Sequence, residues 1–237
     1  MLDSKAKLFN TMVAHGKVLV LYQPKVDAET RKVVGYEALS RLGNRDNIIS
    51  PAVFMDILTD EMRVRLFITV LNIIQRDINS GLFDNNIRLS LNIEPKTLLS
   101  PLISDILKLV NYQVAEMLEI EIIEKPIPSN EWSKLYSIMD TIKSSTSFTF
   151  SLDDFGVEGA GFKSLHLPGV VGVKLDGSLI PKNESQKRVF ENTTTMLKSI
   201  GMKLTLEKVE TEEEASELRH LVDEFQGYLF GKPTILR

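Results

Sequence analysis

Residues 118–123 read Leu-Glu-Ile-Glu-Ile-Ile, and residues 148–154 read Phe-Thr-Phe-Ser-Leu-Asp-Asp. Both stretches alternate apolar and polar side chains, which is the pattern of a β-strand with two different faces. The same alternation recurs near residues 87–93, 170–175 and 202–207. The apolar members can pack on helices while the polar members point together to the opposite side, so the pattern predicts one sheet with a polar face.

Strands of this kind alternate with helical patterns along the whole chain. We predict eight strands, near residues 18–23, 33–40, 87–93, 118–123, 148–153, 170–175, 202–207 and 225–230. Helix starts are marked by Ser50-Pro51 and by a capping box of Thr211 and Glu214. This order predicts an α/β protein, and eight units close most naturally into a TIM-type (βα)8 barrel. The 237 residues suit a single domain over residues 1–237, since such barrels take about 250 residues.

The first connection departs from the regular barrel. Residues 24–32 separate the first two strands, and this interval is too short for a helical crossover. We therefore predict a modified barrel whose first strand runs antiparallel to the second. The interval before the third strand is long, and it predicts two helices near residues 51–59 and 61–78.

Composition excludes several classes of function. The 28 Lys and Arg residues against 32 Asp and Glu residues give a net charge of −4, which argues against holding DNA or an anionic membrane by bulk charge. The absence of cysteine excludes disulfides, Cys-ligated zinc and thiol nucleophiles, and the three histidines show no metal-ligand spacing. No apolar stretch reaches the roughly 18 residues of a membrane span, and no secretory signal is visible, so we expect a cytoplasmic protein without a DNA or membrane partner.

Acidic side chains gather at the carboxyl ends of the predicted strands, where barrel enzymes place their sites. Converging carboxylates repel one another and are costly to bury unless a cation neutralises them. The candidate ligands offer only hard oxygen atoms, which favours Mg²⁺ or Mn²⁺ over zinc; they are Asn92, Glu121, Asp153, Asp154 and Glu207. Any one of them also suits an ordinary strand end or helix cap, but the repetition on five strands favours a metal site.

Three acidic residues need separate comment, the adjacent pair Asp153 and Asp154 and the single residue Glu210. Because adjacent strand residues face opposite ways, Asp153 and Asp154 reach one metal pair only if the chain bends, which we expect at Gly156. Glu210 precedes an acidic first helical turn that suits the helix dipole, so it fits a site or a helix terminus equally well.

Eight ordered motifs then carry a resemblance over nearly the whole chain. They are Tyr22-Gln23-Pro24, Gly35-Tyr36-Glu37-Ala38-Leu39-Ser40-Arg41, Leu91-Asn92, Glu121-Ile122-Ile123-Glu124, Asp153-Asp154-Phe155-Gly156, Lys174-Leu175-Asp176, Glu207-Lys208-Val209-Glu210 and Gln226-Gly227-Tyr228. In order and spacing the chain resembles the EAL-domain family. The resemblance implies a modified barrel with an antiparallel first strand, and a metal-dependent phosphodiesterase that opens cyclic di-GMP to the linear dinucleotide pGpG and lowers the level of this second messenger.

The resemblance also implies roles for individual residues. Two divalent ions, Mg²⁺ or Mn²⁺, are expected, the first held by Glu37, Asn92, Glu121 and Asp153, and the second by Asp153, Asp154 and Glu207. Lys174 resembles the lysine that contacts the attacking water, and Asp176 resembles an acid that holds the metal site. The substrate groove is expected to include Gln23, Arg41 and Gln226, and Glu124 is expected to steady the loop after the fifth strand. The family also implies a homodimer.

The chain departs from the family in two places. Residues 157–161 read Val-Glu-Gly-Ala-Gly where the family usually has Thr-Gly-Tyr-Ser-Ser, and Lys208 follows Glu207 where the family has glycine. These departures keep open a second hypothesis, a catalytically silent EAL-like module that binds nucleotide or a protein partner as a sensor or antagonist. A third hypothesis is another Mg²⁺-dependent barrel enzyme, acting on a small carbon acid with Lys174 as the base.

Overall fold

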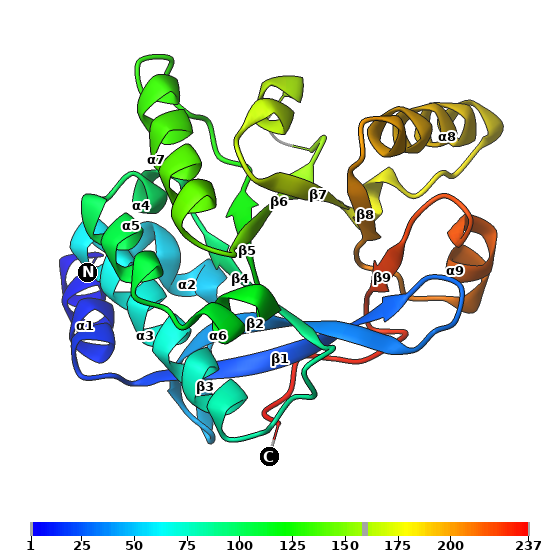
Figure 1. Ribbon diagram of the computed structural model, residues 1–237. Coiled ribbons are helices and arrows are strands. Elements are labelled where there is room, and N and C mark those ends of the chain that lie inside the picture. Colours follow the sequence, from blue (N-terminus) through cyan, green and yellow to red (C-terminus); the bar gives the residue numbers. More distant parts are fainter. Residues whose placement is uncertain (1, 158–160, 237) are drawn as a thin grey trace.

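Eight strands close into the barrel wall, and the short strand β3 extends the wall beside β2 (Figure 1). The computed structural model describes residues 2–157 and 161–236. Hydrogen-bonded neighbours follow the order β1-β9-β8-β7-β6-β5-β4-β2, and β1 pairs with β2 to close the circle. The strands are β1 (Val18–Asp27), β2 (Val33–Asn44), β3 (Asn47–Ile49), β4 (Arg88–Ile93), β5 (Leu118–Ile123), β6 (Thr149–Phe155), β7 (Val170–Leu175), β8 (Lys203–Leu206) and β9 (Glu224–Gln226). The predicted barrel is confirmed.

Strand β1 runs antiparallel to both of its neighbours, β2 and β9. The remaining barrel pairs, from β2–β4 to β8–β9, are parallel. Since only residues 28–32 join β1 to β2, the chain has to return directly, and the predicted antiparallel first strand is confirmed. Both strands are longer than predicted, and the end of β2 pairs with β3, a strand that was not among the eight predicted.

Helices cover the outside of the barrel (Figure 1). They are α1 (Leu2–Ala14), α2 (Pro51–Phe54), α3 (Asp60–Asn79), α4 (Pro95–Leu98), α5 (Pro101–Lys108), α6 (Tyr112–Met117), α7 (Trp132–Ser145), α8 (Glu184–Ser199) and α9 (Glu212–Leu218), with 3-10 turns η1 (Met55–Ile57), η2 (Phe162–His166) and η3 (Gly177–Leu179). The helix predicted at 51–59 is divided into α2 and η1, whereas the one predicted at 61–78 is α3. Among the helices of the described ranges, none has both the length and the apolar character to cross a membrane.

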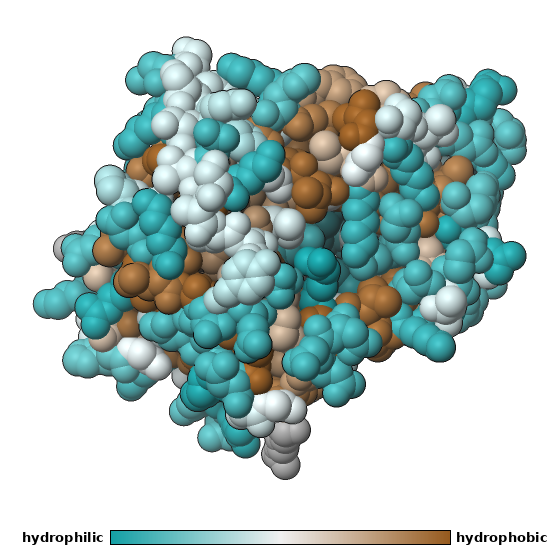
Figure 2. Space-filling model, viewed as in Figure 1, coloured by the Kyte–Doolittle hydropathy of each residue, from teal (hydrophilic) through white to brown (hydrophobic). Residues whose placement is uncertain are grey.

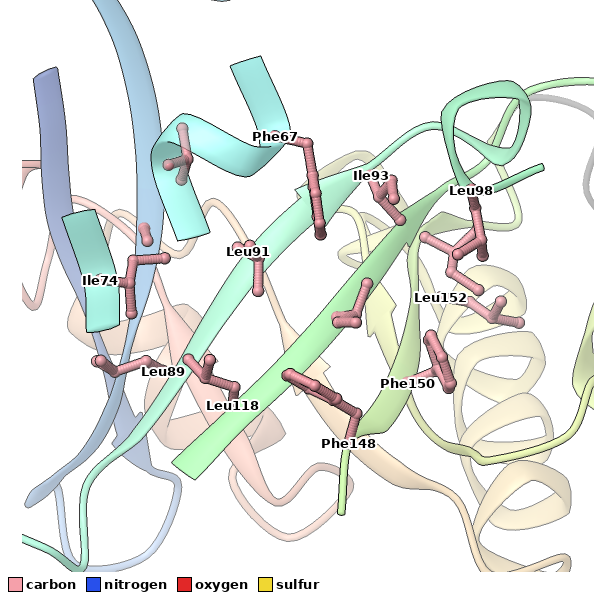
Figure 3. Close-up of a cluster of buried hydrophobic side chains, with 14 of the residues drawn as sticks. Phe67, Ile74, Leu89, Leu91, Ile93, Leu98, Leu118, Phe148, Phe150 and Leu152 are labelled. Atoms are coloured by element: carbon pink, nitrogen blue, oxygen red, sulfur yellow. The ribbon is translucent and has the colours of Figure 1, made fainter. Parts of the chain in front are cut away.

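The apolar members of the two-faced strands pack outward against these helices. Figure 3 shows Leu89 and Leu91 of β4 on the side of the strand that faces Phe67 and Ile74 of α3. All four side chains are buried, and each contributes about 1.5–3 kcal/mol of hydrophobic free energy. Because successive strand residues face opposite ways, this packing directs the intervening polar side chains into the barrel.

The strand predicted at 225–230 ends early, at Gln226. A Cβ at Gly227 would lie 2.0 Å from the carbonyl oxygen of Val209, so only glycine allows this close approach. The chain turns here, and the Leu229 amide donates to that same Val209 oxygen at 3.2 Å. The turn leaves Gln226 as the last strand residue, with its side chain buried.

The capping box at the start of α9 is present as predicted. The Thr211 hydroxyl accepts from the Glu214 amide at 3.2 Å, and the Glu214 carboxylate accepts from the Thr211 amide at 3.1 Å. We expect Thr211→Ala to lower the free energy of unfolding by about 0.5–2 kcal/mol, because one amide at the helix start loses its acceptor. Urea unfolding followed by circular dichroism measures this, and Thr211→Ser, which keeps the acceptor, is the control. Equal losses in the two variants would contradict the assigned role of the hydroxyl.

Candidate functional site

The polar side chains inside the barrel meet at the carboxyl ends of the parallel strands. Strand register sets their positions, since Asn92 of β4 lies beside Glu121 of β5, and Gln23 of β1 lies beside Glu37 of β2. Lys174 of β7 lies inside the same wall, beside Thr205 of β8. Side chains from strands that are distant in sequence therefore form one cluster, which we call the acidic cluster: Glu37, Glu121, Asp153, Asp154 and Glu207.

Lys174 lies at the centre of the acidic cluster. Its ammonium nitrogen is 2.8 Å from Glu207, 2.9 Å from Asp153, 2.9 Å from Glu121 and 3.2 Å from Glu37. The lysine is 1% exposed, so solvent screens these contacts little. Burial by itself lowers the pKa of Lys174, but the four carboxylates outweigh it and raise the pKa well above its ordinary value. Lys174 is therefore positively charged, and it holds together four acidic side chains that come from four different strands or strand ends.

A second buried lysine, Lys25 of β1, was not among the predicted site residues. Its ammonium is 2.6 Å from Glu121, on the side of this carboxylate not occupied by Lys174. Burial raises the pKa of Glu121, yet the two lysines outweigh burial and hold this pKa at about 2. The available sequence signal was the position of Lys25, two residues after Gln23, which places both side chains on the same face of β1.

Glu37 is held by two amide side chains as well as by Lys174. The Asn92 amide donates to one carboxylate oxygen of Glu37, and the Gln226 amide donates to the other at 2.6 Å. The Gln226 amide is also 3.2 Å from the side-chain oxygen of Gln23. The structure thus brings three predicted residues, Gln23, Glu37 and Gln226, into one hydrogen-bonded group.

The side chains of Asp153 and Asp154 reach the same place because the backbone bends between them. Asp154 has a left-handed φ of 54°, and the pairing of β6 with β7 shifts register between Leu152 and Phe155. The bend begins at Asp154 itself, earlier than the predicted position at Gly156, which also has a positive φ, of 89°. A left-handed residue breaks the strict alternation of a strand, so both carboxylates can face one point.

The geometry fits divalent metal ions bound by oxygen ligands. One carboxylate oxygen from each of Asp153, Asp154 and Glu207 lies within 4.8 Å of the others. The buried side-chain oxygen of Asn92 accepts no hydrogen bond from the described residues, so it remains available to a cation. In total, five carboxylates of the acidic cluster face the two ammonium groups of Lys25 and Lys174. This excess of negative charge and hard oxygen donors suits Mg²⁺ or Mn²⁺.

Two carboxyl groups of the acidic cluster are electrostatically disfavoured as anions. Burial raises the pKa of Asp153 well above its ordinary value, and the neighbouring acids Glu207, Glu121 and Glu37 add to this rise against the opposing effect of Lys174. Burial also raises the pKa of Glu207, again against Lys174. Additional positive charge would stabilise both anions.

Asp176 and Lys208 meet at the edge of this site. Asp176 precedes η3 and accepts from the Ser178 amide at 2.8 Å, while its other oxygen forms an ion pair with the ammonium group of Lys208. Burial raises the pKa of Asp176, but the Lys208 and Ser178 hydrogen bonds outweigh it and lower the pKa. Asp176 is not in the group of three acids that could hold a metal, so its predicted role in holding the metal site stays a prediction.

The other two predicted residues are Arg41 and Glu124. Arg41 is half-buried and donates to the carbonyl of Ser40 at 2.8 Å, and Glu124 is buried directly after β5. Neither is among the described residues that line the two clefts at the acidic cluster. Of the unusual loop at residues 157–161, positions 158–160 lie outside the described residues.

Two clefts open beside the acidic cluster, and both include Glu37, Asp153 and Asp154. The polar cleft has a volume of about 450 Å³; its lining is Gln23, Glu37, Leu39, Asp153, Asp154, Glu207, Lys208, Glu210, Gln226, Gly227 and Tyr228. The apolar cleft, of about 290 Å³, reaches from Asn92 to the α3 side chains Leu66, Phe67 and Val70. Figure 2 shows a hollow near the middle of the face drawn, with hydrophilic residues at its floor and on one side and hydrophobic residues on the other. The acidic cluster therefore borders polar side chains on one side and apolar side chains on the other.

These features define a barrel protein with an acidic, metal-type site at the carboxyl ends of its strands. The EAL domain family model matches residues 6–233, and the chain belongs to this family.

Two relatives of this chain are named as cyclic di-GMP phosphodiesterases. The chain is 28% identical over 222 residues to the probable cyclic di-GMP phosphodiesterase PdeB of Escherichia coli K12, covering 91% of this chain and 42% of that protein. It is 26% identical over 224 residues to the cyclic di-GMP phosphodiesterase PdeL of the same organism, covering 90% and 61%. The chain thus spans less than two thirds of either relative.

Solved structures show the same fold. An EAL domain protein from Listeria monocytogenes EGD-e superposes with a TM-score of 0.78 at 28% identity, covering 95% of this chain and 92% of that one. The FimX EAL domain of Xanthomonas citri, solved in complex with c-di-GMP, superposes with a TM-score of 0.81 at 17% identity, covering 100% and 96%. The modified barrel is therefore common to this chain and these domains.

Proposed function

We propose that this chain is a metal-dependent phosphodiesterase that hydrolyses one phosphodiester of cyclic di-GMP and yields pGpG. The observation that carries the proposal is the acidic cluster beside the polar cleft, in a chain of the EAL domain family. Relatives named as cyclic di-GMP phosphodiesterases, and a structural neighbour solved with c-di-GMP, support the choice of substrate.

The ligands for two divalent ions are available in this cluster. Glu37, Asn92, Glu121 and Asp153 would hold one Mg²⁺ or Mn²⁺, and Asp153, Asp154 and Glu207 would hold the other. Bound metals supply charge to activate a water nucleophile and to stabilise the phosphate oxygens during in-line displacement.

The chain's own residues would position the metal ligands, the attacking water and the substrate. Lys174 holds the carboxylates of four strands in one place and, on the resemblance, also contacts the attacking water. Gln23 and Gln226 present amides to the polar cleft, where they suit a phosphate or guanine edge. Arg41 is proposed to contact substrate from the rim, Asp176 to support the metal site, and Glu124 to steady its loop. A cytoplasmic homodimer is part of the same proposal.

Product analysis tests the proposal directly. Purified protein is incubated with cyclic di-GMP in Mg²⁺, in Mn²⁺ and in chelator, and the nucleotides are separated by chromatography. We expect pGpG in the two metal samples and unchanged substrate in chelator. Intact cyclic di-GMP in all three samples would refute hydrolysis.

A second candidate is a catalytically silent module that binds nucleotide or a protein partner. Lys208 favours this second candidate. Its ammonium group, which pairs with Asp176, lies beside the proposed ligands of the second metal and would repel a divalent ion. Calorimetric binding of cyclic di-GMP with no product over hours would select this candidate. Product formation within minutes would exclude it.

A further inference from the structure

Lys208 is distinctive in the polar cleft because of its charge. Of the described residues that line this cleft, it is the one with a cationic side chain, while Glu37, Asp153, Asp154, Glu207 and Glu210 are acidic. Its side chain is 64% exposed, so its ammonium group is accessible from the cleft and from solvent. Among the described residues that line the polar cleft, an anionic ligand therefore meets one cationic side chain, in addition to the divalent ions of the proposed function.

The backbone at Lys208 holds a conformation that lysine ordinarily avoids. Its φ is 56°, in the left-handed region, where a side chain costs roughly 1–2 kcal/mol. The backbone at Lys208 lies close to Gly177, where a Cβ would lie 2.7 Å from the Cβ of Lys208 and 2.8 Å from the carbonyl of Glu207, so the close approach requires glycine at position 177. A strained non-glycine residue at the edge of a site is an observation that points to a use for its side chain.

The partner of Lys208 leaves its ammonium group able to move. Asp176 is buried and already accepts a hydrogen bond from the Ser178 amide, so its carboxylate keeps one donor when the lysine turns away. A phosphodiester oxygen is also a negatively charged acceptor. It can therefore replace the Asp176 carboxylate as the partner of the Lys208 ammonium group. Rotation of the flexible lysine stem can move the charge from Asp176 into the cleft, where the contact with the phosphodiester oxygen has to offset the loss of the ion pair with Asp176.

We propose that Lys208 is a substrate-binding residue whose ammonium group receives an anionic phosphodiester oxygen of the dinucleotide in the polar cleft. This inference rests on the proposed function, because cyclic di-GMP is the ligand. It assigns to Lys208 an attraction for the ligand that adds to that of the proposed divalent ions, and to Asp176 the holding of the ammonium group before the ligand arrives.

Equilibrium binding of cyclic di-GMP tests the role of Lys208. The titrations are done by calorimetry in Ca²⁺, with chromatography of the final mixture to verify that the dinucleotide is intact. We expect Lys208→Gln and Lys208→Gly to weaken binding about five- to ten-fold, the upper value corresponding to about 1.4 kcal/mol. Lys208→Arg, which keeps the charge, should restore most of the affinity. Raising NaCl from about 0.05 to 0.5 M should weaken binding to the wild type more than binding to Lys208→Gln.

The controls separate this inference from the proposed function. Lys187→Gln also removes a lysine from an ion pair, here with Glu217, but outside the cleft, so its affinity should equal that of the wild type. Thermal unfolding verifies that each variant is folded. If wild type and Lys208→Gln bind equally and with the same salt dependence, the role of Lys208 is refuted while the proposed function stands. If the wild type binds no cyclic di-GMP, both are refuted.

Discussion

Replacing Glu37 with glutamine is expected to abolish hydrolysis of cyclic di-GMP while the barrel remains folded. The carboxylate of Glu37 is surrounded by Lys174, Asn92 and Gln226, and it faces the acidic cluster. Glutamine keeps the volume but removes the charge that a divalent cation needs, so we expect kcat/KM to fall by about 10³-fold or more. Glu37→Ala should show the same loss. Chromatographic rates of pGpG formation measure it.

The matched control for Glu37 lies at the other end of the same barrel. Glu224 is also buried, with its carboxylate 3.1 Å from the hydroxyl of Thr205, but it opens to neither cleft at the acidic cluster. Glu224→Gln should therefore retain most of the activity. Thermal unfolding of both variants shows whether they are folded. Hydrolysis by Glu37→Gln at the wild-type rate would show that this carboxylate is not a metal ligand.

Replacing Lys174 with methionine is expected to give the largest loss of stability. Methionine fills a similar volume, but four buried carboxylates lose their shared cation. Removing one partner of a buried ion pair costs about 3–5 kcal/mol, because the remaining charge has neither a partner nor water. We expect a loss of at least this size in the free energy of unfolding, measured by urea denaturation in chelator.

Lys25→Met is the matched control for Lys174. Lys25 is also buried but, among the described residues, forms a close ion pair with Glu121 alone, so its loss should be the smaller one. Mg²⁺ or Mn²⁺ should recover part of the stability of Lys174→Met, because a divalent ion neutralises the same carboxylates. Wild-type stability of Lys174→Met in chelator would contradict the central role of this lysine.

The amino-acid sequence by itself determined the two-faced strands, the barrel and the antiparallel first strand. These features depend on local signals. Alternation of side chains within about six residues defines a strand and its polar face, and a short connection such as residues 28–32 allows only a direct return. Because the carboxyl ends of parallel strands meet at one end of a barrel, the same pattern also indicated where Asn92, Glu121 and Glu207 would lie.

Only the tertiary structure decided which of these residues touch. Lys25 meets Glu121, 96 positions away, and Lys174 meets Glu37, 137 positions away, because sheet closure and register bring their strands together. The bend at Asp154 depends on a register shift between β6 and β7, which no local sequence pattern predicts. The physical reason is that periodicity fixes the face of a side chain, whereas its partners are fixed by the packing of distant strands around a shared interior.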